Sequence, residues 1–292
     1  MLKDGCAFGR FMIERFVGSG ATGMVYRAHS LDGKRTVAVK VLAPHLAKDP
    51  GVVTMFAEEA KVGFQLNHAN IVKTIEIGCT EGLHFIVFEF VDGMPLSTLL
   101  LKGPLEEGQC IWILRQLGQA LRQLRQKSIV HQDIKPDNIL IEGRGNAMLT
   151  DLGFARAPKG RMQWDGFAVG TPVYMSPEQA RGLKTVDGRA DLYSLGATIY
   201  HAATGRPPFE SKDETELLMM HVKDRAEPAR TRNPKLNADF SAILARMLEK
   251  DPQWRFQHPE ELLLAIRMLE VTPVPPFVAG SAQPPSQQQD KR

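Results

Sequence analysis

The sequence lacks most features that mark secreted, membrane and nucleic-acid-binding proteins. Its three cysteines, Cys6, Cys79 and Cys110, are far apart and form no CxxC pair, which argues against a disulfide framework or zinc site and indicates a reducing compartment. A net charge of +3 is too small to favour a nucleic-acid partner. No stretch approaches the roughly 18 apolar residues of a membrane-spanning helix, and no apolar core follows the first residues, so we expect neither a membrane span nor a secretory signal. The expectation is a cytoplasmic globular protein.

The order of hydrophobic patterns predicts an α+β fold with two unlike lobes. Residues 11–45 indicate strands, a helix is expected from Asp49-Pro50 to about Leu66, and strands follow over 71–78 and 83–91. The 3.6-residue period of helices then dominates in five segments: 106–127, 189–204, 213–223, 237–249 and 259–270. We therefore predict a small, antiparallel β-rich N-lobe with one helix and a larger, mainly helical C-lobe.

The predicted domain covers residues 10–271 and is followed by a tail. The N-lobe is expected over about 10–90, the hinge over 89–93 and the C-lobe over 94–271. Residues 272–292 are rich in Pro, Gln and Ser with few large apolar side chains, so they cannot bury enough surface to offset their ordering entropy. We predict a disordered tail, and whether it also docks a partner is left open.

A glycine-rich loop near the N-terminus is the first motif that indicates chemistry. It fits the pattern GxGxxGxV with Gly18, Ser19, Gly20, Gly23 and Val25. Glycines let the backbone approach phosphates closely and offer them N–H groups. The same glycines also occur in dinucleotide-binding folds, where a helix and then an acidic ribose-binding residue follow. Here a strand follows, and Lys40 occupies that window, which suits nucleotide phosphates rather than a ribose hydroxyl.

The segment from His131 to Asn138 is the strongest signal. Phosphate transfer to a hydroxyl needs a carboxylate near the acceptor, a cation near the moving charge and oxygen ligands for magnesium. Asp133, Lys135 and Asn138 supply one of each within six residues, and Asp151 adds a second metal-binding carboxylate after a short hairpin. Each residue alone is an ordinary surface or turn residue, but their order and spacing together are highly specific.

With these motifs the chain resembles the protein kinase superfamily, and most closely the bacterial Hanks-type Ser/Thr kinases, over roughly residues 10–271. Further blocks of the family pattern stand in the right order: VAVK (37–40), DLG (151–153), GTPVYMSPE (170–178), DLYSLG (191–196), GRPPF (205–209) and DPQWRF (251–256). The resemblance implies a two-lobed protein-kinase fold, ATP and Mg²⁺ as cofactors, and a protein as phosphate acceptor.

The resemblance also implies a role for each matching residue. Lys40 is expected to hold the α- and β-phosphates and to pair with Glu58 or Glu59, of which the family spacing favours Glu59. The catalytic set comprises Asp133 as the base, Lys135 at the γ-phosphate, and Asn138 and Asp151 on magnesium. The adenine site comprises Val25 and Ala38 above the ring, Leu140 below it, the backbone of Glu89 and Val91, and Phe88 as a bulky gatekeeper.

Structural roles follow from the same resemblance. Glu178 and Arg255 are expected to form a buried ion pair that joins the activation segment to the C-lobe, and Asp191 to cap the backbone of the catalytic loop. Lys135 together with Thr171 indicates a Ser/Thr rather than a Tyr kinase. Phe154 after the Asp-x-Gly motif favours Ser over Thr in the acceptor.

The chain departs from the family pattern in its activation segment. Gln132 stands where many kinases have an Arg that meets a loop phosphate, and residues 152–170 contain no Ser, Thr or Tyr. Our hypothesis is that loop phosphorylation does not switch this protein, and that packing of Trp164 and Phe167, or a partner, orders the loop. Thr171 is expected to contact Asp133 and Lys135.

Two other functions are consistent with this fold. A catalytically dead scaffold is disfavoured because Lys40, Asp133, Asn138 and Asp151 are all present. A kinase for a small molecule is disfavoured because such relatives generally lack the block at 170–178 that builds the peptide-binding surface. The sequence identifies neither the substrate nor the activating signal. Phosphothreonine-binding domains are frequent companions of the bacterial family and are one expected kind of partner.

Overall fold

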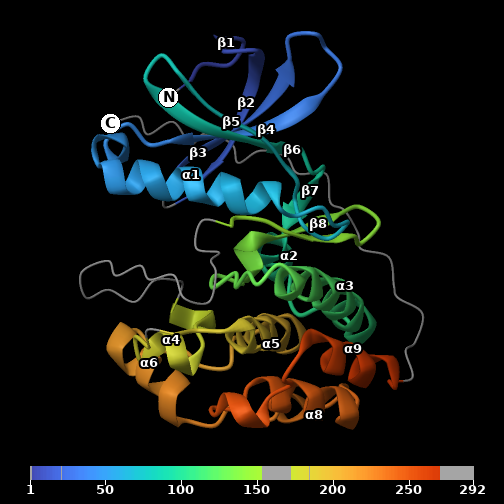
Figure 1. Cartoon of the computed structure of the whole chain (residues 1–292). Coiled ribbons are helices and arrows are strands. Elements are labelled where there is room, and N and C mark those ends of the chain that lie inside the picture. Colours follow the sequence, from blue (N-terminus) through green and yellow to red (C-terminus); the bar gives the residue numbers. More distant parts are fainter. Residues whose placement is uncertain (1, 21, 153–171, 184, 270–292) are drawn as a thin grey trace, which may run out of the picture.

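A computed structural model describes residues 2–20, 22–152, 172–183 and 185–269. Within them the chain folds into two lobes stacked one above the other, with the sheet and α1 in the upper lobe and the other helices in the lower lobe (Figure 1). The predicted α+β, two-lobed architecture is confirmed. Residues 154, 164, 167 and 171 and the tail, on which several predictions depend, lie outside the described residues.

The N-lobe is built on a six-stranded sheet in the order β1-β2-β3-β4-β6-β5, with antiparallel pairing throughout. Its strands are β1 (Ala7–Phe8), β2 (Phe11–Ser19), β3 (Gly23–Ser30), β4 (Thr36–Leu42), β5 (Thr74–Thr80) and β6 (Leu83–Glu89). Alternate side chains of β4 point to opposite faces, so Ala38 and Lys40 share a face. In the register of β3 with β4, Val25 lies opposite Lys40. The sheet thus brings three of the predicted nucleotide-binding residues together.

The N-lobe helix α1 (Pro50–Phe64) begins where the sequence predicts. The side chain of Asp49 accepts a hydrogen bond from the N–H of Gly51, and Pro50 occupies the first helical turn, where no hydrogen-bond donor is lost. The helix buries Val52, Phe56 and Ala60 against Ile86 of the sheet in one apolar cluster. This packing fixes the rotation of the helix and therefore the direction in which its acidic residues point.

The hinge joins β6 to a second, three-stranded sheet in the order β7-β8-β9. Its strands are β7 (Gly93–Pro95), β8 (Ile139–Glu142) and β9 (Ala147–Leu149). The C-lobe helices are α2 (Leu96–Leu100), α3 (Glu107–Gln126), α4 (Pro177–Ala180), α5 (Gly188–Thr204), α6 (Glu214–Lys223), α7 (Ala229–Arg232), α8 (Ala238–Met247) and α9 (Pro259–Arg267). Short 3₁₀ helices cover Leu46–Lys48, Pro136–Asn138, Pro172–Tyr174 and Pro252–Trp254.

The largest hydrophobic core lies in the C-lobe around α3 and α5. Helix α5 is buried on nearly every side, which explains why its sequence is apolar with few charges. The five helices predicted from periodicity are found within a few residues of their expected ends, whereas β1, β7, α2, α4 and α7 are short elements that the periodicity did not indicate. Helix α5 therefore lies at the centre of the C-lobe core.

Candidate active site

Lys40 meets two carboxylates where the lobes face each other. Its Nζ lies 2.8 Å and 3.0 Å from the two carboxylate oxygens of Glu59 on α1. It also lies 3.1 Å from Oδ1 of Asp151, which follows β9 in the C-lobe. Of the two acidic candidates on α1, Glu58 instead contacts Lys61 on the exposed side of the helix. One ammonium group thus links the sheet, α1 and the C-lobe.

Lys40 remains protonated at neutral pH in this setting. Burial alone would lower its pKa, but the charges of Asp151 and Glu59 outweigh burial and raise the pKa of Lys40 above its ordinary value. Asp151 keeps 37% of its side chain exposed, while that of Glu59 is 2% exposed. The carboxylate of Asp151 is therefore the one of the pair that a ligand can reach.

Asp133 is held in one orientation by its neighbours in the catalytic loop. The side-chain amide of Asn138 donates to Oδ2 of Asp133 at 2.9 Å and to its backbone carbonyl at 2.8 Å. The Nζ of Lys135 lies 2.8 Å from the same Oδ2. The 3₁₀ helix Pro136–Asn138 creates this geometry, because it turns the chain back so that Asn138 faces Asp133. Asp133 is 5% exposed, so its carboxylate has few alternative positions.

His131 supports the loop from beneath. Its Nδ1 accepts from the N–H of Asp133 at 3.3 Å, so Nε2 carries the hydrogen and donates to the carbonyl of Thr150 at 3.2 Å. Burial lowers the pKa of His131, which keeps the imidazole neutral and fixes this tautomer. The residue therefore ties the catalytic loop to the strand that leads to Asp151.

The backbone of Gln132 is held from two sides. The carboxylate of Asp191 on α5 accepts from the N–H of His131 at 2.8 Å and from that of Gln132 at 2.9 Å, which confirms the predicted cap. The side-chain amide of Gln179 on α4 donates to the carbonyl of Gln132 at 2.8 Å. Gln132 has a positive φ of 69°, a conformation that non-glycine residues rarely adopt, and these bonds stabilise it. Burial raises the pKa of Asp191 to about 7, although the two N–H donors oppose this.

An apolar surface lies beside Lys40. Phe88, Val91 and Met148 are buried in one cluster, and Ala38 and Leu140 pack against it while keeping part of their surface exposed. The N–H of Val91 donates to no acceptor within the described part of the chain, so it can donate to a ligand. Glu89 ends β6 directly before it. Ala38, Leu140 and Val91 of this surface belong to the residues that the resemblance assigns to the adenine site.

Glycine is explained by different physical constraints at different positions of the predicted phosphate loop. A Cβ on Gly23 would lie 2.0 Å from the carbonyl oxygen of Val41, so close packing of β3 on β4 requires this glycine. A Cβ on Gly18 or Gly20 would meet no atom within 4 Å. Ser19, between them, is exposed at the end of β2. Packing therefore explains Gly23, while Gly18 and Gly20 leave open space in which the backbone can approach a ligand.

The donor set fits magnesium bound together with a polyphosphate. The described residues contain no cluster of three His, Cys, Asp or Glu side chains that could hold a metal ion alone. Magnesium is typically bound by one or two protein oxygens, with phosphates and water completing its octahedron. Asn138 and Asp151 are the oxygen-bearing side chains that the resemblance assigns to magnesium, and both belong to the C-lobe side of the site.

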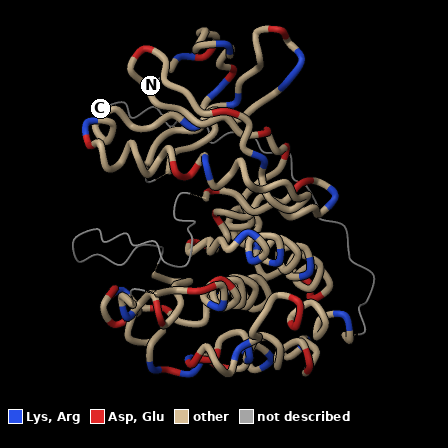
Figure 2. The backbone as a smooth tube through the Cα atoms, viewed as in Figure 1, with Lys and Arg blue, Asp and Glu red and all other residues tan. Residues whose placement is uncertain are grey.

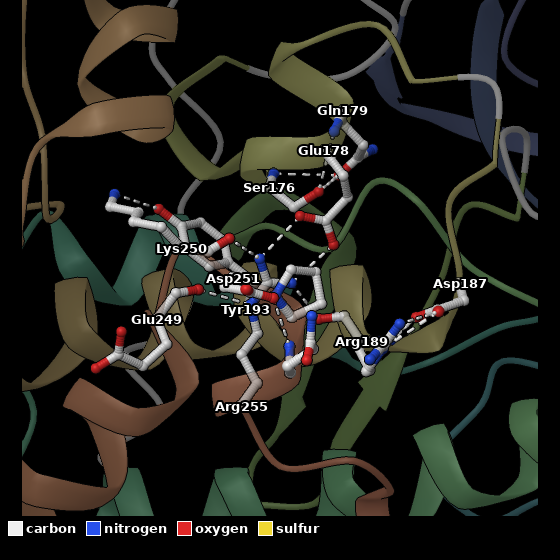
Figure 3. A network of polar contacts seen from close by, with 12 residues as sticks. Ser176, Glu178, Gln179, Asp187, Arg189, Tyr193, Glu249, Lys250, Asp251 and Arg255 are labelled. Carbon is white, nitrogen blue, oxygen red and sulfur yellow. Dashed lines mark hydrogen bonds and ion pairs between the residues drawn. The ribbon is translucent and has the colours of Figure 1, made fainter.

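Arg255 and Glu178 form the predicted buried ion pair in the C-lobe (Figure 3). Nη1 and Nη2 of Arg255 donate to the two oxygens of Glu178 at 2.7 Å and 2.8 Å. The remaining N–H groups donate to the backbone carbonyls of Glu249, Arg189 and Lys250. All five donors of the guanidinium are therefore used, which is what a fully buried arginine requires.

The sequence did not predict the roles of three residues near 172–178, the described part of the block that the resemblance assigns to peptide binding. Gln179 contacts the catalytic loop, His201 lies 2.7 Å from the hydroxyl of Tyr174, and Nε2 of His221 lies 3.1 Å from the carbonyl of Val173. The only sequence signal is that His201 and His221 fall in predicted helices. Buried polar residues of this kind usually have a partner, but the sequence does not show which one.

Charges of both signs are interspersed over both lobes in the described part of the chain (Figure 2). Among the described residues, no helix is both long enough and apolar enough to cross a bilayer. The charge distribution gives no support to an extended basic surface of the kind that tracks nucleic acid.

Three comparisons with known proteins agree. A family model described as protein kinase domain matches residues 11–264. Serine/threonine-protein kinase PknB of Mycobacterium tuberculosis is 36% identical over 261 residues, which cover 87% of this chain and 42% of PknB. Serine/threonine-protein kinase PrkC of Bacillus subtilis is 33% identical over 256 residues, covering 87% of this chain and 39% of PrkC. The chain thus spans about two fifths of the length of these curated relatives.

A solved structure is similar over almost its whole length. The crystal structure of the Mycobacterium tuberculosis PknI kinase domain matches with a TM-score of 0.71 and 26% sequence identity. The match covers 91% of this chain and 99% of that one. The likeness therefore includes both lobes.

Proposed function

Because this chain belongs to the protein kinase family, we propose that it is a Ser/Thr protein kinase that transfers the γ-phosphate of ATP to protein hydroxyl groups. The observation that supports this most strongly is the convergence of Lys40, Glu59 and Asp151 at one point while Asn138 and Lys135 hold Asp133. A scaffold has no need for this complete set of charged groups. The activity is proposed for a chain much shorter than its curated relatives.

Asp133 is the base in this proposal. The acceptor oxygen forms a bond to the γ-phosphorus, the bond from that phosphorus to the oxygen shared with ADP breaks, and the hydroxyl proton passes to Asp133. Asn138 and Lys135 both contact Oδ2, so Oδ1 is the oxygen that faces the acceptor. Lys135 also places a positive charge beside the phosphate that moves, which lowers the cost of its developing charge.

Lys40 holds the α- and β-phosphates, with Glu59 fixing its position. Asn138 and Asp151 would hold magnesium, which neutralises phosphate charge when bound. Gly18, Ser19, Gly20 and Gly23 cover the phosphates. Adenine is assigned to the surface formed by Val25, Ala38, Leu140 and the backbone of Glu89 and Val91.

Activity in this proposal does not depend on phosphorylation of the activation segment. Gln132 offers no cationic fork to a phosphate, and its backbone is instead fixed by Asp191 and Gln179. Residues 152–170 offer no hydroxyl. We further propose a preference for Ser acceptors, a cytoplasmic location and a regulatory or phosphothreonine-binding partner. The domain limits of 10–271 are likewise proposals.

The test is phosphate transfer from ATP to myelin basic protein by phosphatase-treated protein in magnesium, followed by mass-spectrometric mapping of both proteins. We expect transfer without delay, mainly to serine, and no phosphate within 152–170. Transfer only after a lysate is added would place the switch outside this chain. Absence of transfer under every condition, with ATP still bound, would support a scaffold. Transfer to aminoglycosides or choline but not to protein would identify a small-molecule kinase.

A further inference from the structure

A connected row of polar groups runs through the C-lobe to the backbone of Val173. His221 on α6 is fully buried, and its Nε2 lies 3.1 Å from the carbonyl oxygen of Val173. Its Nδ1 lies 2.9 Å from the hydroxyl of Tyr193 on α5. A carbonyl oxygen only accepts, so the hydrogen is on Nε2, and the Tyr193 hydroxyl donates to Nδ1. The network therefore selects one tautomer of His221.

Lys250 lies at the other end of this row of polar groups. Its Nζ donates to the carbonyl of His221 at 2.9 Å and to that of Met220 at 3.3 Å, which satisfies the last turn of α6. It also lies 3.4 Å from the Tyr193 hydroxyl and 4.2 Å from the centre of the Phe209 ring. This contact leaves the phenol hydrogen free to point at His221. Figure 3 shows Lys250 beside Tyr193, next to the ion pair of Arg255.

The charges around His221 keep it neutral. Burial lowers the pKa of His221 to about 4, and the positive charge of Lys250 acts in the same direction. The groups packed around it are Tyr193 from α5, Phe209 and Lys250, and Arg255 lies over the Tyr193 ring at 5.0 Å. No carboxylate in the described part of the chain is among its contacts. At neutral pH His221 is therefore neutral, and its one N–H group, at Nε2, faces the carbonyl of Val173.

The segment that these groups hold, Pro172–Tyr174, lies in the block that the kinase resemblance assigns to acceptor binding. Tyr174, which follows Val173, is also held by a histidine, because its hydroxyl lies 2.7 Å from Nδ1 of His201 on α5. Two adjacent residues are thus fixed by histidines from two different helices. We propose that His221, oriented by Tyr193, is a positioning residue that shapes the surface on which the protein acceptor binds. This inference rests on the proposed kinase function.

A matched control lies on the same helix. The hydroxyl of Tyr200 donates to the carbonyl of Glu227 at 2.8 Å, and Arg232 lies over its ring at 5.3 Å. Tyr200 and Tyr193 are therefore both buried tyrosines of α5 with a hydrogen bond and a cation over the ring. Only Tyr193 is connected to Val173, so Tyr200→Phe removes an equivalent bond without affecting the acceptor segment.

The experiment measures KM for myelin basic protein, KM for ATP, kcat and the melting temperature of wild type and four variants. Tyr193→Phe is expected to raise KM for the acceptor by about two- to tenfold, the effect of one lost buried hydrogen bond, while KM for ATP changes less than about twofold. His221→Leu is expected to raise KM for the acceptor further. His221→Gln, whose amide can still donate to Val173, is expected to restore it to within about threefold. Tyr200→Phe should match wild type.

Acceptor KM values in Tyr193→Phe and His221→Leu equal to that of Tyr200→Phe would overturn the inference. Parallel increases of KM for ATP and KM for the acceptor, together with a fall in melting temperature, would also overturn it, because they indicate a general structural role. If His221→Leu does not fold, Tyr193→Phe and His221→Gln still decide the matter. Wild type that transfers no phosphate at all would instead refute the proposed function, and the inference with it.

Discussion

Two buried cation–carboxylate pairs in the described part of the chain are built differently. Arg255 donates five hydrogen bonds, two to Glu178 and three to backbone carbonyls, all within the C-lobe. Among the described residues, the ammonium group of Lys40 hydrogen-bonds only to carboxylates, those of Glu59 in the N-lobe and Asp151 in the C-lobe. The side chain of Arg255 is fully buried, whereas that of Asp151 is 37% exposed.

This difference indicates which pair serves the fold and which serves a ligand. Three of the five acceptors of Arg255 are backbone carbonyls, which it cannot exchange without opening the C-lobe. Within the ranges that the structure describes, the ammonium group of Lys40 donates to no backbone carbonyl, and the phosphate oxygens of a nucleotide can replace the Asp151 carboxylate there. We therefore expect Lys40 to matter for phosphate transfer and Arg255 for stability.

The largest expected effect is on catalysis at Lys40. Lys40→Met removes the cation that holds the phosphates, and we expect the rate of phosphate transfer to fall by about three orders of magnitude or more, with the fold retained. The rate is measured with saturating ATP and myelin basic protein. Lys34→Met, at a lysine whose side chain is 79% exposed, is the matched control and should keep the wild-type rate. A Lys40→Met rate above a tenth of wild type would contradict the assignment.

The second effect is on stability at Arg255. Arg255→Met leaves the Glu178 carboxylate buried without its partner, and we expect the free energy of unfolding to fall by about 3–5 kcal/mol. Urea unfolding followed by circular dichroism measures it. Arg206→Met, at an exposed arginine, should change it by less than about 0.5 kcal/mol. Equal stability of the two variants would show that the buried pair does not hold the lobe together.

The third effect is a pH dependence at His221. The pKa of His221 is lowered to about 4 in the folded protein, against 6.5 as its ordinary value. The unfolded chain therefore binds the proton more readily, and stability falls as the pH falls through this window. From linkage we expect a loss of about 2 kcal/mol between pH 7 and pH 5.

His221→Gln has no titrating ring, so it serves as the reference for this loss. Urea unfolding at pH 7 and pH 5 gives the change for each protein, and wild type should lose about 2 kcal/mol more than the variant. An equal loss in both proteins would mean that groups other than His221 carry the pH dependence.

The smallest expected effect is at Gln132. Because Asp191 and Gln179 hold the backbone of Gln132, its side chain is not needed for loop geometry. Gln132→Arg is therefore expected to change kcat by less than about threefold, which corresponds to less than about 0.7 kcal/mol in the activation free energy. Phosphatase treatment should not change the activity of wild type or of Gln132→Arg. Strong activation of wild type or of Gln132→Arg by a kinase that phosphorylates the activation segment would contradict the proposal that activity does not depend on phosphorylation there.

Local motifs made most of the site predictable. Asp133, Lys135 and Asn138 lie within six residues, so the turn that joins them also brings their side chains together. The helical elements were predicted because their apolar period repeats over several turns. The family spacing favoured Glu59 over Glu58, and in the structure α1 turns Glu59 inward because Phe56 and Ala60 on the same side are buried.

The features that the sequence did not predict depend on contacts between residues that lie far apart in the sequence and belong to no motif. Gln179 contacts a residue 47 positions away, and His221 one that is 48 positions away, so no local pattern marks them. Strand β7 contains a glycine and a proline, which disfavour strands, and it forms because β8 pairs with it. Tertiary structure therefore decided these elements against local preference.

The most direct test of the account is the rate of phosphate transfer by Asp133→Asn, measured together with its free energy of unfolding. Asparagine keeps the shape of the side chain and can still accept from Asn138 and Lys135, but it cannot take a proton. We expect the rate to fall by about three orders of magnitude or more while the free energy of unfolding changes by less than about 1 kcal/mol. Asp239→Asn, at an exposed position on α8, is the control and should retain both values. A rate within tenfold of wild type would contradict the claim that Asp133 is the base.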